Sequence, residues 1–517
     1  MMKPETIDIM NMKQRFYKTV CIGLLGLVVF SCIGVSELSS TPETENALQR
    51  LRKKIDDILA TSSLKGASVG IQIISLDSQE TVYERNPELS LNPASNTKLV
   101  TSAAALVRLT PQYQFQTSVY TDARLKDGVL EGHLYLKGGG DPGLTYQDLL
   151  ALAQDVYYSG IRTITGDIVG DDTFFDDERE FSGWHDFDRA YSGKMSALSL
   201  GENSVHLIIK PSYRSGVAPE IVLNPPTSYI QIVNKAVTLS SNGIYASFAK
   251  NQPASDDESA QETLIVQGKI SQKSQHGLSA YVNVNNPSLL TTTAFKDALQ
   301  QVGITVKGKA ATGTLPKKSR QLALFASEPL SSIIYESNKS SSNFVAEQIL
   351  KTLGAEMFGS PGTTQKGIQA VQEFLVELGI QPDAYILENG SGLSRKNRFS
   401  AEQIVTLLQY MHTDFSVKAE YLASLAIAGV DGTLRRRLQD TQAERRLRAK
   451  TGYVRNVSCL SGYAASQENE TFAFAILLND YKTGTYDMRK IQNQIGLSLT
   501  EFYRQTYNAS VAEKSRK

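Results

Sequence analysis

The chain carries Ser95-Asn96-Thr97-Lys98 at the start of an apolar helical pattern that continues to Leu106, and this stretch is the best guide to its fold and chemistry. Residues three apart lie on one face of a helix, so the Lys98 amine is expected within hydrogen-bonding reach of the Ser95 hydroxyl. A lysine placed there can act as the base for a serine nucleophile without any histidine. Its charge must then be disfavoured, which burial or a second cation can do.

Two further stretches follow in order, Ser341-Ser342-Asn343 and Lys450-Thr451-Gly452. Each is common by itself, and Ser341 alone is more simply explained as the N-cap of a helix. In combination, the three stretches predict a serine acyl-transfer site. Ser341 is expected to relay a proton to the leaving amine, Asn343 to hold Lys98 and the substrate backbone, and Lys450 to supply the second cation.

The stretch from Lys450 onward is expected to form one wall of the site as a strand. Lys450 and Thr451 can bind a substrate carboxylate, and Gly452 has no side chain to block a peptide lying alongside. The backbone N–H of Tyr453 is expected to join that of Ser95 as an oxyanion donor. Strict alternation sends Lys450 and Thr451 to opposite faces, so both can serve only where the strand is twisted or just beginning.

Composition and charge exclude several classes of protein. A chain of 517 residues exceeds what one hydrophobic core supports, so two or three domains are expected. Lys+Arg and Asp+Glu both number 53, which argues against a nucleic-acid partner. The five histidines are scattered, so neither a metal site nor another cofactor is expected. A local basic run either attracts an anionic substrate or is a solvated face; it comprises Arg435, Arg436, Arg437, Arg445, Arg446, Arg448 and Lys450.

The N-terminus has the pattern of an export signal. Lys13, Arg15 and Lys18 precede an apolar run from Val20 to Phe30 that is too short for a typical spanning helix. The protein is therefore expected in the periplasm or at the outer face of the cytoplasmic membrane. Three outcomes stay open for this segment: cleavage, acylation at Cys32 as a lipoprotein, and retention as a membrane anchor.

Cys459 is then the only cysteine of the folded part, so no internal disulfide is expected there. It lies in an apolar stretch that is predicted to be a buried strand. A packed, inert thiol is expected.

The chain is predicted to form one discontinuous domain interrupted by an insertion. Residues 114 to 313 show short alternating segments with Gly, Asp and Asn turns, which is typical of mainly β structure. The expected division is 1–40 for the signal or anchor and linker, 44–113 with 314–510 for the main domain, 114–223 with 269–313 for one inserted domain, and 224–268 for another. Around the motifs, helices are predicted from Ser331 to Leu353, Thr364 to Leu378, Ser400 to Met411 and Met488 to Phe502, and strands from Ala67 to Ser75, around Tyr83, from Leu460 to Ala464 and from Phe472 to Leu478.

Further stretches accompany the three motifs in one order along the chain. They are Gly138-Gly139-Gly140-Asp141-Pro142, which is predicted to be a structural turn, Gly166-Asp167-Ile168-Val169-Gly170-Asp171-Asp172, Ser196-Ala197-Leu198-Ser199-Leu200, Gly390-Ser391-Gly392-Leu393-Ser394-Arg395 and Gly429-Val430-Asp431-Gly432-Thr433-Leu434. Together with the motifs they resemble the low-molecular-mass class C penicillin-binding proteins. This is the D-alanyl-D-alanine carboxypeptidase/endopeptidase family that acts on peptidoglycan, and the likeness extends from about residue 45 to 505.

The resemblance implies an α+β fold. In it, a transpeptidase/β-lactamase-like domain, with an antiparallel sheet and helices on both sides, carries a large, mainly β two-domain insertion. It also implies a serine DD-carboxypeptidase that removes D-alanine from peptidoglycan stem peptides, with cleavage of D-alanyl cross-links as a DD-endopeptidase left open, and with β-lactams as covalent inhibitors. The alternatives are a β-lactamase and a catalytically weak protein that recognises wall peptides or β-lactams.

The resemblance also implies roles for individual residues. Ser95 corresponds to the acylated nucleophile, Lys98 to its base, Ser341 and Asn343 to the relay and positioning groups, and Lys450 with Thr451 to the clamp on the terminal carboxylate. Family members hold the stem side chain with an aspartate and an aromatic residue of the insertion and with an arginine after the Gly-Ser-Gly loop; the candidates here are Asp172, Phe175 and Arg395.

Two positions depart from the family pattern. Asn389 stands where an aspartate usually precedes Gly-Ser-Gly, which alters the charge of that loop. Tyr453 stands where a small hydroxyl residue is commoner, which reshapes the substrate channel. Neither departure removes a catalytic group.

Overall fold

The computed structural model describes residues 42–181, 183, 193–240, 245–251, 261–274 and 277–504. The predicted export signal and Cys32 lie outside these residues. In the part of the chain that is described, no helix has the length and apolar character needed to cross a membrane.

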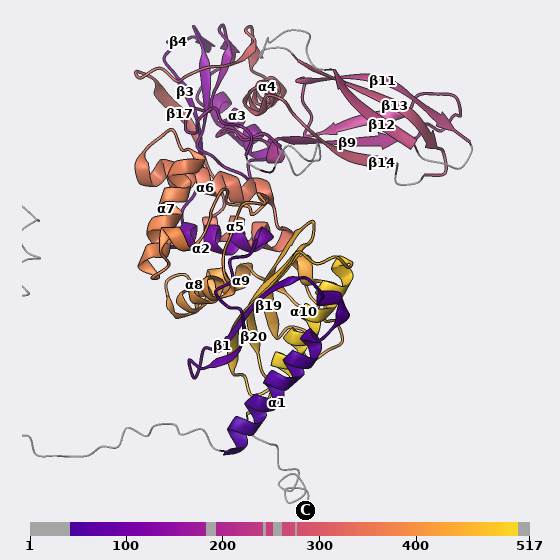
Figure 1. Cartoon of the computed structure of the whole chain (residues 1–517). Coiled ribbons are helices and arrows are strands. Elements are labelled where there is room, and N and C mark those ends of the chain that lie inside the picture. Colours follow the sequence, from indigo (N-terminus) through magenta and orange to yellow (C-terminus); the bar gives the residue numbers. More distant parts are fainter. Residues whose placement is uncertain are drawn as a thin grey trace, which may run out of the picture.

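One six-stranded sheet forms the centre of what we call the main unit, in the order β18-β19-β20-β21-β1-β2. All its neighbouring strands are antiparallel. β1 pairs with β21 along its whole length, so a strand from the first third of the chain lies beside one from the last third (Figure 1). The strands are β1 (Ser68–Ser75), β2 (Thr81–Arg85), β18 (Ala426–Ile427), β19 (Leu447–Val454), β20 (Val457–Ala465) and β21 (Thr471–Asn479).

Helices cover both faces of this sheet, as expected for the α+β fold class. Because side chains alternate along a strand, Phe474 and Ile476 of β21 pack on α1 and α10, whereas Ala475 and Leu477 pack on the layer that contains α2 and α8. Figure 1 shows these two helical layers on opposite sides of the sheet. The helices are α1 (Pro42–Leu59), α2 (Thr97–Leu109), α5 (Leu330–Ser340), α6 (Asn343–Phe358), α7 (Thr364–Glu377), α8 (Ala401–Thr413), α9 (Lys418–Ser424) and α10 (Thr485–Thr500), with short 3-10 turns η2 (Ser62–Leu64), η3 (Ala94–Asn96), η6 (Pro382–Ala384) and η7 (Gly432–Leu434).

The first inserted unit combines two small sheets with two helices. Its sheets have the orders β16-β8-β6-β3-β17 and β15-β7-β5-β4. The helix α3 was not expected in a mainly β region, although Thr145 and Asp148 form a capping box at its start. The elements are β3 (Gln116–Thr121), β4 (Leu125–Lys126), β5 (Val129–Leu130), β6 (Leu134–Gly138), α3 (Tyr146–Tyr158), β7 (Thr163–Ile164), β8 (Ile168–Asp171), α4 (Pro287–Gln301), β15 (Thr305–Val306), β16 (Ala310–Thr312) and β17 (Arg320–Ala326).

The insertion continues beyond residue 313, its predicted end. β17 pairs antiparallel with β3, so Arg320–Ala326 belong to the inserted sheet. The boundary therefore falls after Ala326. A single strand carries no sequence signal for the sheet it will join, because that choice depends on a partner some 200 residues away.

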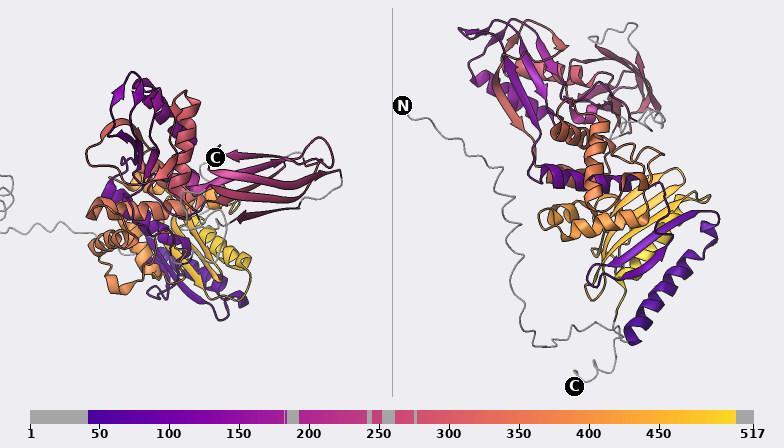
Figure 2. Two further views of the ribbon diagram at one scale, coloured as in Figure 1. Left: turned by 90° about the horizontal axis from the view of Figure 1, so that it is seen from above. Right: turned by 60° about the vertical axis from the view of Figure 1, so that its left-hand side comes forward.

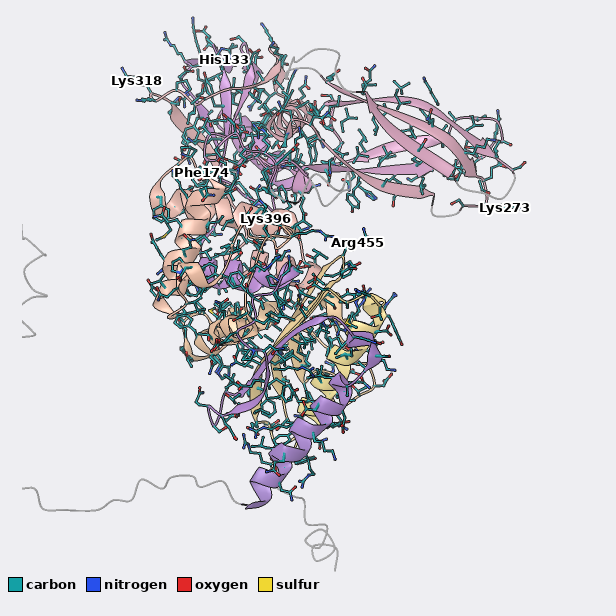
Figure 3. All side chains as sticks on the ribbon, in the orientation of Figure 1. His133, Phe174, Lys273, Lys318, Lys396 and Arg455 are labelled. Atoms are coloured by element: carbon teal, nitrogen blue, oxygen red, sulfur yellow. The ribbon has the colours of Figure 1, made fainter. Side chains whose placement is uncertain are left out.

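The second inserted unit is a β finger that projects from the rest of the molecule (Figures 1 and 2). It is larger than the predicted range 224–268, because strands on both sides of that range share its apolar cluster, among them β9 through Val205 and Leu207. Figure 3 shows Lys273 near its far end. The elements are η5 (Gly201–Asn203), β9 (Ser204–Lys210), β10 (Glu220–Asn224), β11 (Ile230–Leu239), β12 (Tyr245–Asn251), β13 (Glu262–Ser271) and β14 (Leu278–Asn283).

The central strand β21 supplies the first testable expectation. Leu477 is fully buried on the face of the sheet that packs on α2 and α8. Leu477→Ala should therefore lower the free energy of unfolding by about 2–5 kcal/mol through lost contacts and a residual cavity. Val376→Ala removes two methyl groups from a side chain that is 42% exposed, so it should change the free energy of unfolding by less than about 0.5 kcal/mol. Urea unfolding followed by circular dichroism measures both, and equal losses would contradict the assigned core.

Candidate active site

Ser95 lies in η3, the turn that leads directly into α2. Ala94 before it has a left-handed backbone with φ of 47°, a conformation that is unusual for alanine and is found at functional sites. The Asn92 side chain accepts a hydrogen bond from the Ala94 N–H at 2.8 Å. The Asn96 amide donates to Ser461 Oγ of β20 at 2.6 Å. The turn is therefore attached to the sheet, and the Ser95 side chain is half-buried at its surface.

Lys98 is the buried centre of the site. Its Nζ donates to Ser95 Oγ at 3.2 Å, to Asn343 Oδ1 at 2.7 Å and to the Ser391 carbonyl at 2.7 Å. Burial lowers the pKa of Lys98 to about 7, and the carboxylate of Glu347 opposes this shift. Near neutral pH a large fraction of the amine is therefore uncharged, and a neutral amine at this distance can accept the Ser95 proton.

Ser341 forms the turn between α5 and α6. It adopts a left-handed backbone with φ of 65°, which costs of order 1 kcal/mol for a residue other than glycine. The N-cap role falls to its neighbour Ser342, whose Oγ accepts a hydrogen bond from the Val345 N–H at 3.3 Å. The Ser341 hydroxyl is thus left to meet Lys450, whose Nζ donates to it at 2.7 Å.

Lys450 is fully buried on β19. Burial, reinforced by the nearby charge of Lys98, holds the pKa of Lys450 well below its usual range. Its Nζ also donates to the Thr451 carbonyl at 3.2 Å, so the long side chain bends back along its own strand. Thr451 points elsewhere and donates to Thr433 Oγ1 of η7 at 2.9 Å. The two side chains leave the strand in different directions, and the length of the lysine brings its amine to Ser341.

Gly452 places β19 against the turn that carries Ser95. A Cβ at this position would lie 2.6 Å from the Pro93 carbonyl oxygen and 3.2 Å from Ala94 Cβ. Contact with the protein backbone, rather than room for a peptide, is therefore the constraint that the structure shows for this glycine. Tyr453 is 55% exposed at the same edge. Figure 3 shows Arg455 just beyond it, at the end of the sheet nearest the inserted units.

The loop after Asn389 closes the other side of the site. Asn389 is fully buried, and its Oδ1 accepts hydrogen bonds from the Gly392 N–H at 3.1 Å and from the Asn397 amide at 2.8 Å. A neutral amide thus stabilises the loop where an aspartate would add a buried charge. Arg395 is exposed, and its carbonyl accepts a hydrogen bond from the Asn92 side chain at 3.0 Å. Arg395 therefore lies on a loop attached to the Ser95 segment.

Two predicted substrate contacts do not join this cluster. Asp172 accepts hydrogen bonds from Arg179 at 2.8 Å, from Ser196 at 3.0 Å and from Ser288, so its carboxylate is engaged within the insertion. Phe175 is 3% exposed and pairs with Gly362, which leaves it no surface for a substrate and corrects the prediction for this residue. Figure 3 shows its neighbour Phe174 where the insertion meets the main unit. Turn-rich sequence has no periodicity to fix the register, which explains the assignment of Phe175; the role of Asp172 stays a prediction.

Three contributors to the site were not identified from the sequence. They are the carboxylate of Glu347, the carbonyl of Ser391 and the hydroxyl of Thr433. Glu347 had a detectable signal, because it follows Asn343 by one helical turn and therefore lies on the same face of α6. A backbone carbonyl leaves no signal of this kind.

The remaining expectations concern residues outside the cluster. Cys459 is a free thiol that is 1% exposed, and burial raises its pKa, as expected for an inert packed cysteine. Arg437 donates to Asn493 of α10 at 2.7 Å, so part of the basic run serves structural contacts. Within the described ranges, no three His, Cys, Asp or Glu side chains are grouped closely enough to hold a metal ion.

Comparison with known proteins identifies the family to which the chain is similar. The model of the D-Ala-D-Ala carboxypeptidase 3 (S13) family matches residues 51–502. The chain is 34% identical over 497 residues to a D-alanyl-D-alanine carboxypeptidase of Actinomadura sp.. That alignment covers 92% of this chain and 90% of the relative. It is 24% identical over 530 residues to a penicillin-sensitive carboxypeptidase A of Dictyostelium discoideum, covering 94% and 99% of the two chains. The crystal structure of penicillin binding protein 4 (dacB) from Haemophilus influenzae superposes with a TM-score of 0.73 at 25% identity, covering 87% of this chain and 99% of that one.

The lowered pKa of Lys98 predicts that a reaction in which this amine takes the proton of Ser95 depends on pH. The rate constant for acylation by a β-lactam should rise with pH through a midpoint near 7, because the amine accepts the serine proton only after losing its own. Labelling rates with fluorescent penicillin between pH 5 and 9 measure this. Lys98→Arg, whose guanidinium stays charged, should remove acylation across the range. A wild-type rate that is flat over these pH values would contradict the assignment.

Proposed function

The chain belongs to the D-Ala-D-Ala carboxypeptidase 3 (S13) family and is a serine-type D-alanyl-D-alanine carboxypeptidase, and we propose that it works through an acyl-enzyme on Ser95. The observation that supports this most strongly is the contact between Ser95 Oγ and the buried amine of Lys98. A buried amine with a pKa near 7 is a base at the pH where the enzyme would act.

In the first half of the proposed reaction, Ser95 Oγ attacks the carbonyl carbon of the penultimate D-alanine, and its proton passes to Lys98. The backbone N–H groups of Ser95 and Tyr453 stabilise the negative oxygen that forms. The C–N bond then breaks, and the terminal D-alanine leaves after its amine takes up a proton. Ser341, which accepts a hydrogen bond from Lys450, relays that proton.

In the second half, water attacks the ester carbon and gives a proton to Lys98; the bond to Ser95 Oγ then breaks, Oγ takes up that proton, and the shortened peptide is released. Lys98 serves again as the base, because it has returned to the neutral form by passing its proton along the Ser341 path. Asn343 keeps the amine in place through both halves by accepting a hydrogen bond from it at 2.7 Å.

The terminal carboxylate of the substrate is held by hydroxyls at the edge of β19. We propose Thr451 and Thr433 for this contact, with the amine of Lys450 behind them. Arg395 lies on the opposite loop, exposed, where it can meet the stem side chain. A D-alanyl cross-link presents the same bond with a longer leaving group, so endopeptidase activity belongs to the same proposal.

The N-terminal segment supports a proposal on location. Its basic residues and short apolar run from Val20 to Phe30 favour export, which brings the enzyme to the compartment of its peptidoglycan substrate. Attachment at Cys32 or by an uncleaved segment is part of this proposal. Mass spectrometry of the mature N-terminus distinguishes the three outcomes.

The nucleophile is tested by substitution. Ser95→Ala should abolish covalent labelling by fluorescent penicillin and lower D-alanine release from a stem pentapeptide by about 10³-fold or more, because no acyl-enzyme can form. Ser340→Ala, at an exposed serine one residue before the motif, serves as the control and should keep both activities. Labelling that survives Ser95→Ala would sink the assignment, and rapid penicillin turnover without D-alanine release would favour a β-lactamase.

The carboxylate clamp is tested at Thr433. Thr433→Val keeps the shape of the side chain but removes its hydroxyl, so KM for the pentapeptide should rise about tenfold with kcat nearly unchanged. A pentapeptide ending in D-alaninamide lacks the carboxylate, and on that substrate the variant and the wild type should perform alike. Thr305→Val, at an exposed strand position of the insertion, is the matched control. An equal loss on both substrates would argue against the clamp.

A further inference from the structure

Glu347 is a buried carboxylate next to the catalytic lysine that the proposed reaction does not use. It lies on α6, one turn after Asn343, and is 1% exposed. Its Oε2 accepts a hydrogen bond from the Gly390 N–H at 2.9 Å, and its Oε1 accepts one from the Ser391 N–H at 2.9 Å. Both oxygens therefore bind one turn of backbone, in the bidentate manner that a carboxylate favours.

This turn is also bound to Lys98. The Ser391 carbonyl accepts a hydrogen bond from Lys98 Nζ at 2.7 Å. On α2, Thr101 Oγ1 donates to the Gly390 carbonyl at 2.8 Å. A Cβ at Gly390 would lie 3.0 Å from the Ala346 carbonyl oxygen, so the turn is packed tightly between α2 and α6. The position of the Ser391 carbonyl thus depends on the carboxylate of Glu347.

Helix α6 supplies a second connection. Asn343 accepts a hydrogen bond from Lys98 and lies on the same face of the helix as Glu347. Two of the hydrogen-bond acceptors around the lysine amine are therefore arranged by one helix, one directly and one through the turn at Ser391. Glu347 makes this arrangement rigid, because removal of its carboxylate leaves two buried N–H groups unpaired.

The charge of Glu347 also acts on the amine. The charged groups that face Lys98 from the packed elements are Glu347 on α6 and Lys450 on β19. Burial raises the pKa of Glu347, and a hydrogen bond with the Ser391 side chain, the two backbone hydrogen bonds and the charge of Lys98 oppose that shift. The carboxylate favours the protonated form of Lys98, so it keeps the pKa of that lysine from falling further.

We propose that Glu347 is a positioning residue, which acts through the Gly390–Ser391 turn and through its charge to hold the Lys98 amine in place and to set the pH at which it becomes a base. The proposal rests on the roles of Ser95 and Lys98 given above. The hydrogen bonds of Glu347 go to the Gly390–Ser391 turn, so its effect on the reaction is carried by the lysine.

The test is the pH profile of acylation by fluorescent penicillin, measured on the full-length enzyme. Glu347→Gln removes the charge and replaces one acceptor oxygen by an NH2 group, which faces a backbone donor. The plateau rate at high pH should fall about tenfold to a hundredfold, because the amine is held less well. The midpoint of the profile should move down by about one pH unit, because the charge that favoured protonated Lys98 is gone.

Two further variants make the result specific. Glu347→Asp keeps the charge on a shorter side chain, so its midpoint should return to the wild-type value while its plateau stays reduced. Glu356→Gln neutralises an exposed glutamate of the same helix, which accepts a hydrogen bond from Tyr113, and should leave both quantities within about twofold of wild type.

A lower plateau with an unmoved midpoint in Glu347→Gln would mean a merely structural contact and would overturn the proposal, as would a midpoint that rises. Should Glu347→Gln fail to fold, Glu347→Asp decides, since a wild-type plateau in that variant contradicts the need for a carboxylate that reaches the Gly390 and Ser391 N–H groups. Labelling that persists in Ser95→Ala would instead overturn the nucleophile assignment, whatever the Glu347 variants do.

Discussion

The structure of the site depends on the burial of one amine, that of Lys98. Its partners come from three separate segments: the turn that holds Ser95, the helix that begins at Asn343 and the loop at Ser391. Loss of water disfavours the charge, and well-placed acceptors keep the group in position. A base that works at neutral pH therefore requires that these segments meet around it in a closed, tightly packed space.

Backbone geometry at the site follows from the same requirement. Ala94 and Ser341 both adopt left-handed conformations that cost energy, next to the nucleophile and at the proposed relay. The surrounding contacts compensate for this: Asn92 fixes Ala94, and the Ser342 cap begins α6 directly after the turn. Such strain persists only where surrounding contacts hold the backbone in place, as they do between the sheet and the layer that contains α2 and α6.

The insertion contacts the helix and the turn that carry Asn343 and Ser341. Lys351 of α6 pairs with Asp176 of the insertion, and Ser342 donates to Glu202 at 3.0 Å. Both contacts reach the helix and turn that carry Asn343 and Ser341. The inserted units thus contact the segments that carry the proposed catalytic residues, and the same junction buries Phe175, which pairs with Gly362.

By itself the sequence determined the helix that places Lys98 three residues after Ser95 and the strand at Lys450, because local periodicity and spacing carry that information. The helix predicted from Ser331 to Leu353 is instead broken at Ser341 into α5 and α6. The contacts of the lysine amine with Ser95 and Asn343 were expected from the motifs, but only the tertiary structure added the Ser391 carbonyl and the nearby carboxylate of Glu347. Glu347 and the Ser391 carbonyl reach Lys98 from distant parts of the chain, and the same is true of β17 joining β3 at the edge of the insertion. Such contacts depend on how the elements pack, and a backbone carbonyl or a strand edge has no signature in the order of residues.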